Sequence, residues 1–207
     1  ENRQLWCDPL GGMSMAVTTL LWGVGATLQL IVLRWAIEHL GLALNQAAYL
    51  QGISALGVII GAILASRYVQ LVQAPKLLPL GLALGLMVPM MLAVHSVAWA
   101  VVLLVFVGGL AGYFVVPMNA LLQHRGCNLL TAGRSIAVQG FNENAGMLVM
   151  LAMYAAATAT NVSLDILIWC FSLLITVTMA TILFTNRRPL TEGSAVEVSA
   201  SQVGQVS

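Results

Sequence analysis

Long apolar segments separated by short polar breaks constrain the fold of this chain more than any other feature of its sequence. A helix needs about 20 apolar residues to cross a bilayer core of about 30 Å. We predict helices rather than barrel strands, because a membrane strand alternates apolar and polar residues whereas 101–106 is apolar throughout. The predicted fold class is therefore an all-α integral membrane protein with six transmembrane helices. The predicted spans are 13–35, 47–69, 77–94, 98–122, 135–158 and 164–184.

Composition excludes the other broad classes of protein. Hydrophobic residues make up 60% of the 207 residues and charged residues only 7%, whereas a soluble domain carries about 25% charged residues. The formal net charge of +1 provides no basic surface for a nucleic-acid partner. The three cysteines lack metal-ligand spacing, and no Walker, HExxH, GxGxxG or GxSxG motif occurs. We therefore expect no enzyme activity, no cofactor and no metal.

The positive charges predict how the spans are oriented. Alternating six spans across the bilayer leaves Arg34 alone at one end and places every other Lys and Arg at the opposite end. Cytoplasmic loops carry the excess of Lys and Arg, so we expect both ends of the chain on the cytoplasmic side. The residues expected there are Arg3, Arg67, Lys76, Arg125, Arg134, Arg187 and Arg188.

The two ends of the chain differ from the apolar part. The chain starts at Glu1, without Met, in a stretch that we interpret as a cytoplasmic loop over 1–12. We therefore expect it to be a piece of a longer polypeptide. The six-helix unit covers 13–188. Residues 189–207 are Ser, Val, Gln and Gly with few large apolar groups, and a flexible cytoplasmic tail is expected there.

Small residues and prolines interrupt the predicted spans. Gly108-x-x-x-Gly112 has the spacing at which membrane helices approach each other closely, and the second span repeats it. Such stripes indicate either tight packing or sliding contacts in a protein that rocks between states. Pro89 and Pro117 each remove a helix hydrogen bond and are expected to kink their helices. A helix broken in this way is tolerated where it lines a cavity, which points to a transport path.

The fifth span carries the densest group of polar side chains. Gln139 and Glu143 are four residues apart, and Asn142 is three residues from Gln139, so the three share one helix face. A charge deep in the bilayer is costly, so this face is expected to meet another helix or water rather than lipid. Either a buried network that joins helices or a site that faces a substrate or ion fits this pattern. Asn144 belongs to the same polar group.

Two other spans carry polar or aromatic side chains that are candidates for the same site. They are Tyr113 and Asn119 in the fourth span and Trp22, Gln29 and Arg34 in the first. Arg34 lies one residue from the outer end of its span and can reach the interface. It either pairs with Glu38, four residues on, or faces the outer mouth of a cavity and attracts an anionic head group.

Six helices with both ends cytoplasmic fit one half of a twelve-helix transporter built from two six-helix halves. Three stretches carry a closer resemblance: LWGVGATL at 21–28, GYFVVPMNALLQHRG at 112–126 and AGRSIAVQGFNEN at 132–144. On these the chain resembles the carboxyl-terminal half of the bacterial lysophospholipid transporter family, a branch of the major facilitator superfamily. The likeness covers about 13–188. It implies one half of a twelve-helix major facilitator fold, with 1–12 leading in from a missing amino-terminal half.

The resemblance also implies a function. Members of the family move lysophospholipids, chiefly lysophosphatidylethanolamine, from the outer to the inner leaflet of the bacterial inner membrane. An acyltransferase/acyl-carrier-protein synthetase, fused or separate, re-acylates them there. Two positions depart from the family pattern, because Gln29 stands where the family often has Arg and Arg34 where an apolar residue is usual.

These expectations combine into a flippase-type carrier that works by alternating access. We expect Glu143, Asn142 and Gln139 to contact the ammonium or glycerol of the lipid head, and the single tail to stay among apolar groups. Tyr113 and Asn119 would add hydrogen bonds, and Gln29 or Arg34 would meet the phosphate. Two alternatives remain open: an ion-coupled carrier of a small soluble solute with Glu143 as the coupling carboxylate, and a membrane anchor domain for an acyltransferase.

Overall fold

The structure is a computed structural model that describes residues 2–186. The predicted tail over 189–207 lies outside the described residues, as do Arg187 and Arg188 at the end of the predicted six-helix unit. Within the described range the chain is helical, with short connections and no strand. The elements in chain order are α1 (Asn2–Cys7), α2 (Pro9–Glu38), α3 (Leu44–Tyr68), η1 (Leu71–Leu77), α4 (Leu78–Met87), η2 (Val88–Ala93), α5 (Val97–Leu129), α6 (Ala132–Ala159) and α7 (Leu164–Thr185).

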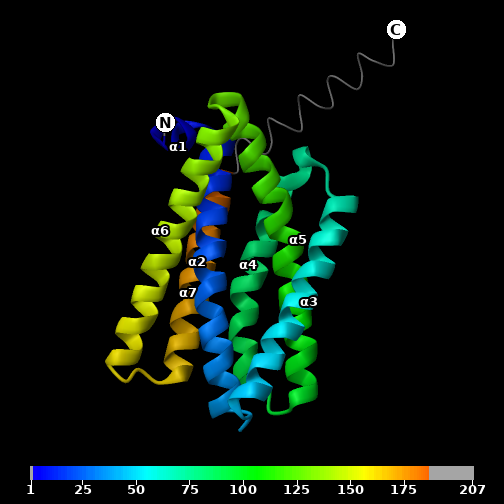
Figure 1. Ribbon diagram of the computed structural model, residues 1–207, viewed down its shortest axis with the longest axis vertical. Coiled ribbons are helices and arrows are strands. Elements are labelled where there is room, and N and C mark those ends of the chain that lie inside the picture. The colour runs from blue at the N-terminus through cyan, green and yellow to red at the C-terminus, as the bar shows by residue number, and fades with distance from the viewer. Residues whose placement is uncertain (1, 187–207) are drawn as a thin grey trace.

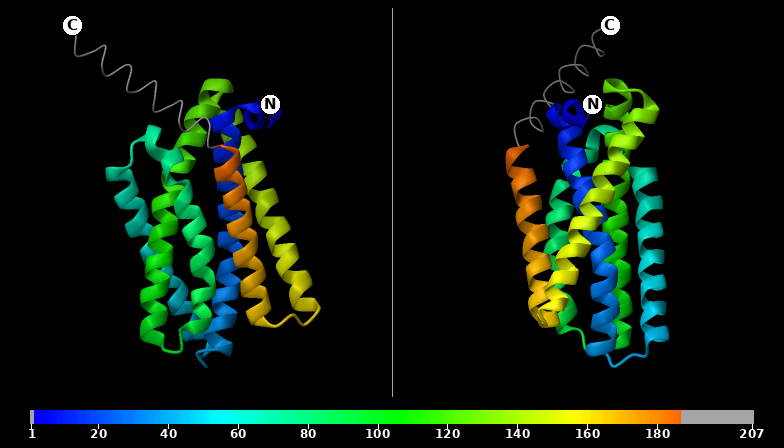
Figure 2. Two further views of the ribbon diagram at one scale, coloured as in Figure 1. Left: turned by 180° about the vertical axis from the view of Figure 1, so that it is seen from behind. Right: turned by 60° about the vertical axis from the view of Figure 1, so that its left-hand side comes forward.

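The long helices run up and down in a bundle (Figure 1). Short connections follow α2, η2 and α6 at one end of the bundle, whereas α1, the connection after α3 and the connection from α5 to α6 lie at the other end. In Figure 2 the view from behind brings α4 and α7 to the front. These two helices pack against each other and against α2 and α5, so they form an outer layer behind the other long helices.

Local sequence explains where the two longest helices begin. Asp8 caps α2, because its carboxylate accepts a hydrogen bond of 2.7 Å from the backbone N–H of Gly11. Pro9 follows at the first helical position, where its missing N–H costs nothing. Ser96 caps α5 by accepting from the N–H of Trp99 at 3.4 Å.

Small residues allow the closest approach of two helices, between α3 and α5. The Cβ of any side chain at Gly61 would overlap the carbonyl oxygen of Gly109, and one at Gly108 would lie 2.5 Å from the carbonyl oxygen of Ser54. Only glycine therefore fits at these contacts, as the sequence pattern predicted for tight helix packing. The contact between α2 and α6 is also close, since a Cβ at Gly23 would lie 2.9 Å from the carbonyl oxygen of Gly146.

Five segments within the described residues are long and apolar enough to cross a membrane, one fewer than the six predicted spans. They are Pro9–Glu38, Leu44–Tyr68, Leu71–Ala93, Val97–Leu129 and Leu164–Thr185. The predicted fifth span does form a helix of 28 residues, α6. The first half of α6 is polar and includes Arg134, Gln139 and Glu143. The mean hydropathy of α6 is therefore lower than that of the other five segments. The protein is thus a helical membrane protein that passes the bilayer several times.

The start of α2 and the end of α5 differ from the sequence-based prediction, whereas the break at Pro89 agrees with it. Residues 2–7 form the short helix α1 and α2 begins at Pro9, whereas a loop over 1–12 was expected; the cap at Asp8 explains the early start. Helix α5 was expected to end near Leu122 but continues to Leu129, because Gly126 packs against Ser135 of α6 instead of breaking the helix. The α-helical part of the third span ends just before Pro89, and η2 continues it as a 3₁₀ helix, as a proline predicts.

Candidate functional site

A hydrogen-bonded polar cluster joins α5 and α6 near the end of the bundle that carries α1. The side-chain amide nitrogen of Gln139 donates to Asn119 Oδ1 at 3.1 Å and to Glu143 Oε1 at 2.8 Å. Gln139 is buried, with 8% of its surface exposed, while Asn119 and Glu143 are half-buried. The predicted shared face of Gln139 and Glu143 is confirmed by this contact. We call Asn119, Gln139 and Glu143 the polar cluster.

Helix α2 adds an aromatic side chain to the polar cluster. Trp22 lies beside the Glu143 carboxyl group, and 45% of its surface is exposed. A carboxylate accepts more hydrogen bonds than the one from Gln139, and an indole face attracts cations. Glu143 and Trp22 together therefore suit a cationic or hydroxyl-bearing group that arrives from the exposed side. Every group that the polar cluster presents is neutral or acidic.

An open stripe runs along α2 from the polar cluster toward the other end of the bundle. Trp22, Gly25 and Gln29 lie at positions i, i+3 and i+7, so they share a helix face, and all three are exposed. No neighbouring atom lies within 4 Å of where a Cβ of Gly25 would be. The side-chain nitrogen of Gln51 in α3 donates to the carbonyl oxygen of Gln29 at 2.6 Å. Gln51 was missed from the sequence, where it stands alone in an apolar span without a partner at helical spacing.

Arg34 lies away from the polar cluster. It follows Trp22 by 12 residues, which is about 18 Å along a helix. Its Nε donates to Glu38 Oε1 at 2.7 Å, with both side chains partly exposed. The ion pair with Glu38 that was one of the two sequence-based readings is therefore formed, at the end of the bundle opposite to α1.

Two of the predicted asparagines form their hydrogen bonds outside the polar cluster. Asn142 donates to the backbone carbonyl of Val138 and to Asn2 Oδ1, and accepts from the indole N–H of Trp6, so α1 holds it. Its spacing from Gln139 was correct, but a three-residue step rotates the side chain enough to meet a different neighbour. Asn144 is exposed and donates to the carbonyl oxygen of Gly140 in its own helix.

Tyr113 is also separated from the polar cluster. It precedes Asn119 by six residues, which places the two side chains about 120° apart around α5. It follows Phe106 by seven residues and so shares the face of that side chain, which is 60% exposed. The structure therefore brings together Trp22, Asn119, Gln139 and Glu143, with Gln29 farther along α2, and leaves Arg34, Tyr113, Asn142 and Asn144 elsewhere.

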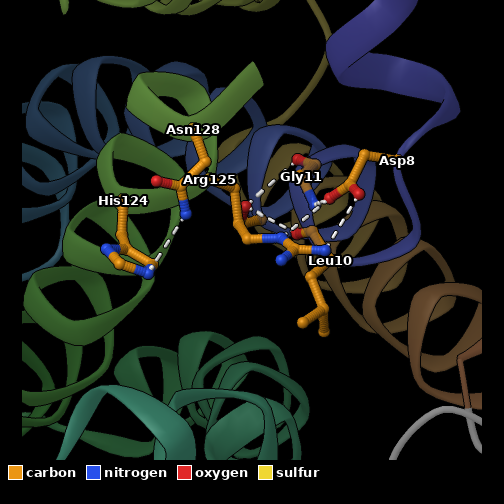
Figure 3. Close-up of polar contacts among 7 residues, drawn as sticks. Asp8, Leu10, Gly11, His124, Arg125 and Asn128 are labelled. Carbon is orange, nitrogen blue, oxygen red and sulfur yellow. Dashed lines mark hydrogen bonds and ion pairs between the residues drawn. The ribbon is translucent and has the colours of Figure 1, made fainter. Parts of the chain in front are cut away.

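An ion pair that the sequence did not predict holds the same end of the bundle. Arg125 of α5 binds both carboxylate oxygens of Asp8, with its Nη2 2.9 Å from Oδ1 and its Nε 3.1 Å from Oδ2 (Figure 3). Asp8 also caps α2, so this pair ties the start of α2 to the end of α5. His124 and Asn128 interact with each other on the other side of Arg125. An Asp before Pro signals a helix cap, but the distant partner leaves no local pattern.

The described residues contain no group of three or more His, Cys, Asp and Glu side chains that could hold a metal ion. The polar cluster and Trp22 offer hydrogen-bonding groups, one carboxylate and one exposed aromatic ring.

The fold is that of a helical membrane protein with several apolar spans, and comparisons with known proteins show what it is similar to. No family model and no solved structure matches the chain. A lysophospholipid transporter of Shigella flexneri is 38% identical over 159 residues, which is 76% of this chain and 40% of the relative. Lysophospholipid transporters of Yersinia pestis (strain Pestoides F) and Yersinia pseudotuberculosis serotype I (strain IP32953) are each 42% identical over 154 residues, 74% of this chain and 38% of the relative.

The predicted resemblance is thereby confirmed: this chain is a homologue of part of the lysophospholipid transporters. It spans about 40% of the length of the curated relatives that it matches.

Proposed function

We propose that this chain is one six-helix half of a lysophospholipid transporter and carries the part of the path that meets the polar head of the lipid. The identity to named lysophospholipid transporters over about three quarters of the chain supports this proposal most directly. In the full protein an amino-terminal six-helix half completes the path. The lipid moves to the cytoplasmic leaflet of the bacterial inner membrane, where an acyltransferase re-acylates it.

The pairing of helices supports a half of the major facilitator type in which α6 also spans the membrane, which brings the number of spans to six. The pairs in contact include α2 with α6, α3 with α5, α4 with α7, α2 with α7 and α4 with α5. When α2 is exchanged with α5, α3 with α6 and α4 with α7, the same set of contacting pairs is obtained. Because each unit has an odd number of helices, the second unit of three starts at the opposite side of the membrane from the first. The two units are therefore inverted relative to each other, as in the inverted repeats of these transporters. Helix α6 of 28 residues, about 42 Å long, has the length that a span needs.

The charges support cytoplasmic ends. Arg67, Lys76, Arg125 and Arg134 lie at the end of the bundle that carries α1, and Arg34 lies at the opposite end. An excess of cations marks the cytoplasmic side, so that end faces the cytoplasm.

The polar cluster and the open stripe on α2 would replace water around the lipid head during transport. A polar head entering hydrocarbon without partners costs several kcal/mol, roughly 2–7 kcal/mol per unpaired group. Glu143 and Trp22 would hold an ammonium, and Gln139 and Asn119 would keep the carboxylate in place. Gln29 lies on the open stripe, nearer the outer end of α2. At that end Arg34 carries the only Lys or Arg charge within the described spans, and it could meet a phosphate there. The acyl chain stays outside the bundle among apolar side chains.

Uptake of labelled lysophosphatidylethanolamine into spheroplasts tests this proposal. In the full-length transporter, Glu143→Gln keeps the shape of the side chain and removes its charge, so uptake is expected to fall about tenfold or more, the value of one charged hydrogen bond. Asp165→Asn is the matched control, because it removes an exposed carboxylate at the other end of the bundle, away from every residue proposed to meet the lipid. Wild-type uptake by a fully expressed Glu143→Gln variant would remove Glu143 from the site.

A carrier of a soluble solute driven by an ion is the second candidate, because Glu143 is a half-buried carboxylate within a membrane helix. Uptake that depends on an imposed proton or sodium gradient, and that excess lysolipid does not inhibit, would favour it. A mere anchor for an acyltransferase would show no uptake in proteoliposomes and would co-purify with that enzyme.

A further inference from the structure

The short helix α1 is bound to the bundle by a fully buried leucine. Leu5 is 0% exposed and packs with Met15 of α2, Leu122 of α5 and, on its rim, Val138 of α6. These are the three helices that carry the polar cluster and Trp22. Helix α1 therefore inserts one side chain into the point at which the three helices meet.

This point lies directly on the cytoplasmic side of the polar cluster. Leu122 follows Asn119 by three residues, about one turn, and Val138 immediately precedes Gln139. In α5 the chain runs toward the end that carries α1, and in α6 it runs away from it (Figure 1). Leu5 thus forms an apolar layer between the polar cluster and the end of the bundle that faces the cytoplasm.

Polar contacts around Leu5 fasten α1 in this position. The indole N–H of Trp6 donates to Asn142 Oδ1 at 3.2 Å, and Asn142 donates to Asn2 Oδ1 at 3.1 Å. The backbone of α1 also lies close to α2, since a Cβ at Gly12 would be 2.5 Å from the carbonyl oxygen of Trp6. The two side-chain hydrogen bonds are exposed to solvent, so water can replace them when α1 leaves.

The connection to α2 is built as a hinge. Asp8 is the one residue between α1 and α2, with an extended backbone at φ −75° and ψ 127°. The Arg125 side chain and the N–H of Gly11 hold the Asp8 carboxylate in place. The start of α2 therefore stays fixed to α5 while rotation about the backbone of Asp8 can move α1.

From this arrangement we infer that α1 is a latch that closes the cytoplasmic exit of the polar cluster. Leu5 fills the space between the three helices and forms the seal, Asn142 holds α1 by hydrogen bonds, and Asp8 is the hinge between α1 and α2. The latch opens when the lipid head leaves for the cytoplasmic leaflet, and closes behind it. This inference rests on the proposed function for what passes the latch, but the seal itself is a property of the chain that can be measured separately.

Thiol accessibility tests the seal without any transport. In the full-length protein with Cys7, Cys127 and Cys170 replaced by Ser, Leu122→Cys places a thiol under Leu5, and Gln123→Cys places one at the exposed neighbouring position. We expect a membrane-impermeant maleimide, added to inverted membrane vesicles, to label Leu122→Cys about tenfold or more slowly than Gln123→Cys. Equal rates in the two variants would show that α1 does not seal this point.

Loosening the latch should expose the buried thiol. Adding Gly12→Ala to Leu122→Cys pushes the carbonyl of Trp6 away, so labelling is expected to rise toward the rate at Gln123→Cys. Gly133→Ala is the matched control at the same end, because no atom lies within 4 Å of a Cβ there. The seal is refuted if Gly12→Ala and Gly133→Ala leave Leu122→Cys equally protected.

Fastening the latch tests its movement. In the full-length protein without Cys7, Cys127 and Cys170, and with Leu122 unchanged, Asn2→Cys and Asn142→Cys are joined by a short cleavable crosslinker between the two thiols. Uptake of labelled lysophosphatidylethanolamine is expected to fall about tenfold or more on crosslinking and to recover on cleavage. Unchanged uptake by fully crosslinked protein would overturn the opening step. If the protein before crosslinking takes up no lysolipid, the proposed function fails instead, while the labelling of Leu122→Cys still decides whether α1 forms the seal.

Discussion

Two contacts between long helices occupy equivalent places in the bundle, α2 with α6 and α3 with α5, yet their chemistry differs. The contact between α3 and α5 is a backbone approach at glycines such as Gly61 and Gly108, within two apolar helices. The contact between α2 and α6 is close at Gly23 but carries Gln139, Glu143 and Trp22 near one end. Of these two contacts, only the one between α2 and α6 carries a carboxylate near the middle of a helix, that of Glu143. Packing alone accounts for the first contact, whereas the cost of burying polar groups in the second calls for a function.

The largest effect is expected from a side chain placed in the glycine contact. Gly61→Val would overlap the carbonyl of Gly109, so the two helices must separate at a cost of about 3 kcal/mol or more. We expect little folded protein in detergent, measured by size-exclusion chromatography and thermal melting. Gly52→Val, where no atom lies within 4 Å, is the control in the same helix. Equal melting temperatures for the two variants would mean that α3 and α5 are not in close contact.

A smaller effect on folding, but a large one on transport, is expected in the polar cluster. Gln139→Leu removes both hydrogen bonds to Asn119 and Glu143, each worth about 1 kcal/mol. The melting temperature should fall by a few degrees, while uptake of labelled lysolipid should fall about tenfold, because the carboxylate of Glu143 loses its orientation. Gln123→Leu, an exposed amide in α5, is the control. If Gln139→Leu lowered stability as much as Gly61→Val and left specific uptake unchanged, the two helix contacts would serve the same purpose.

The smallest effects are expected at the predicted site residues that lie outside the polar cluster. Asn144→Ala removes one exposed hydrogen bond within α6, and Tyr113→Phe removes a hydroxyl on a different face of α5 from Asn119. Each variant is expected to keep uptake within about twofold of the wild type. A loss comparable with that of Gln139→Leu would extend the site to those positions.

Much of the fold could be predicted from apolar length alone, because a bilayer forces long helices with satisfied backbones. The glycine spacing in particular predicted close helix contacts, and the contact of Gly61 with Gly109 is one of them. The length of α5 could not be predicted, since Gly126 reads as a break until Ser135 is known to pack on it.

Within the site, local spacing predicted the local contacts. Gln139 and Glu143 share a face because they lie four residues apart, and the same spacing predicted the pair of Arg34 and Glu38. Contacts between distant segments left no such trace. Asn142 meets α1 across 140 residues of sequence, which no helical period could indicate.

A photoreactive lysophosphatidylethanolamine tests the central claim most directly. With the reactive group on the glycerol, illumination of the full-length transporter in membranes should attach the lipid to the α2 and α6 segments around Trp22 and Glu143, and unlabelled lysolipid should compete. Mass spectrometry of the labelled peptides reads out the position. Labelling confined to the outward apolar faces of α3 or α7, with none near Trp22 or Glu143, would contradict the account.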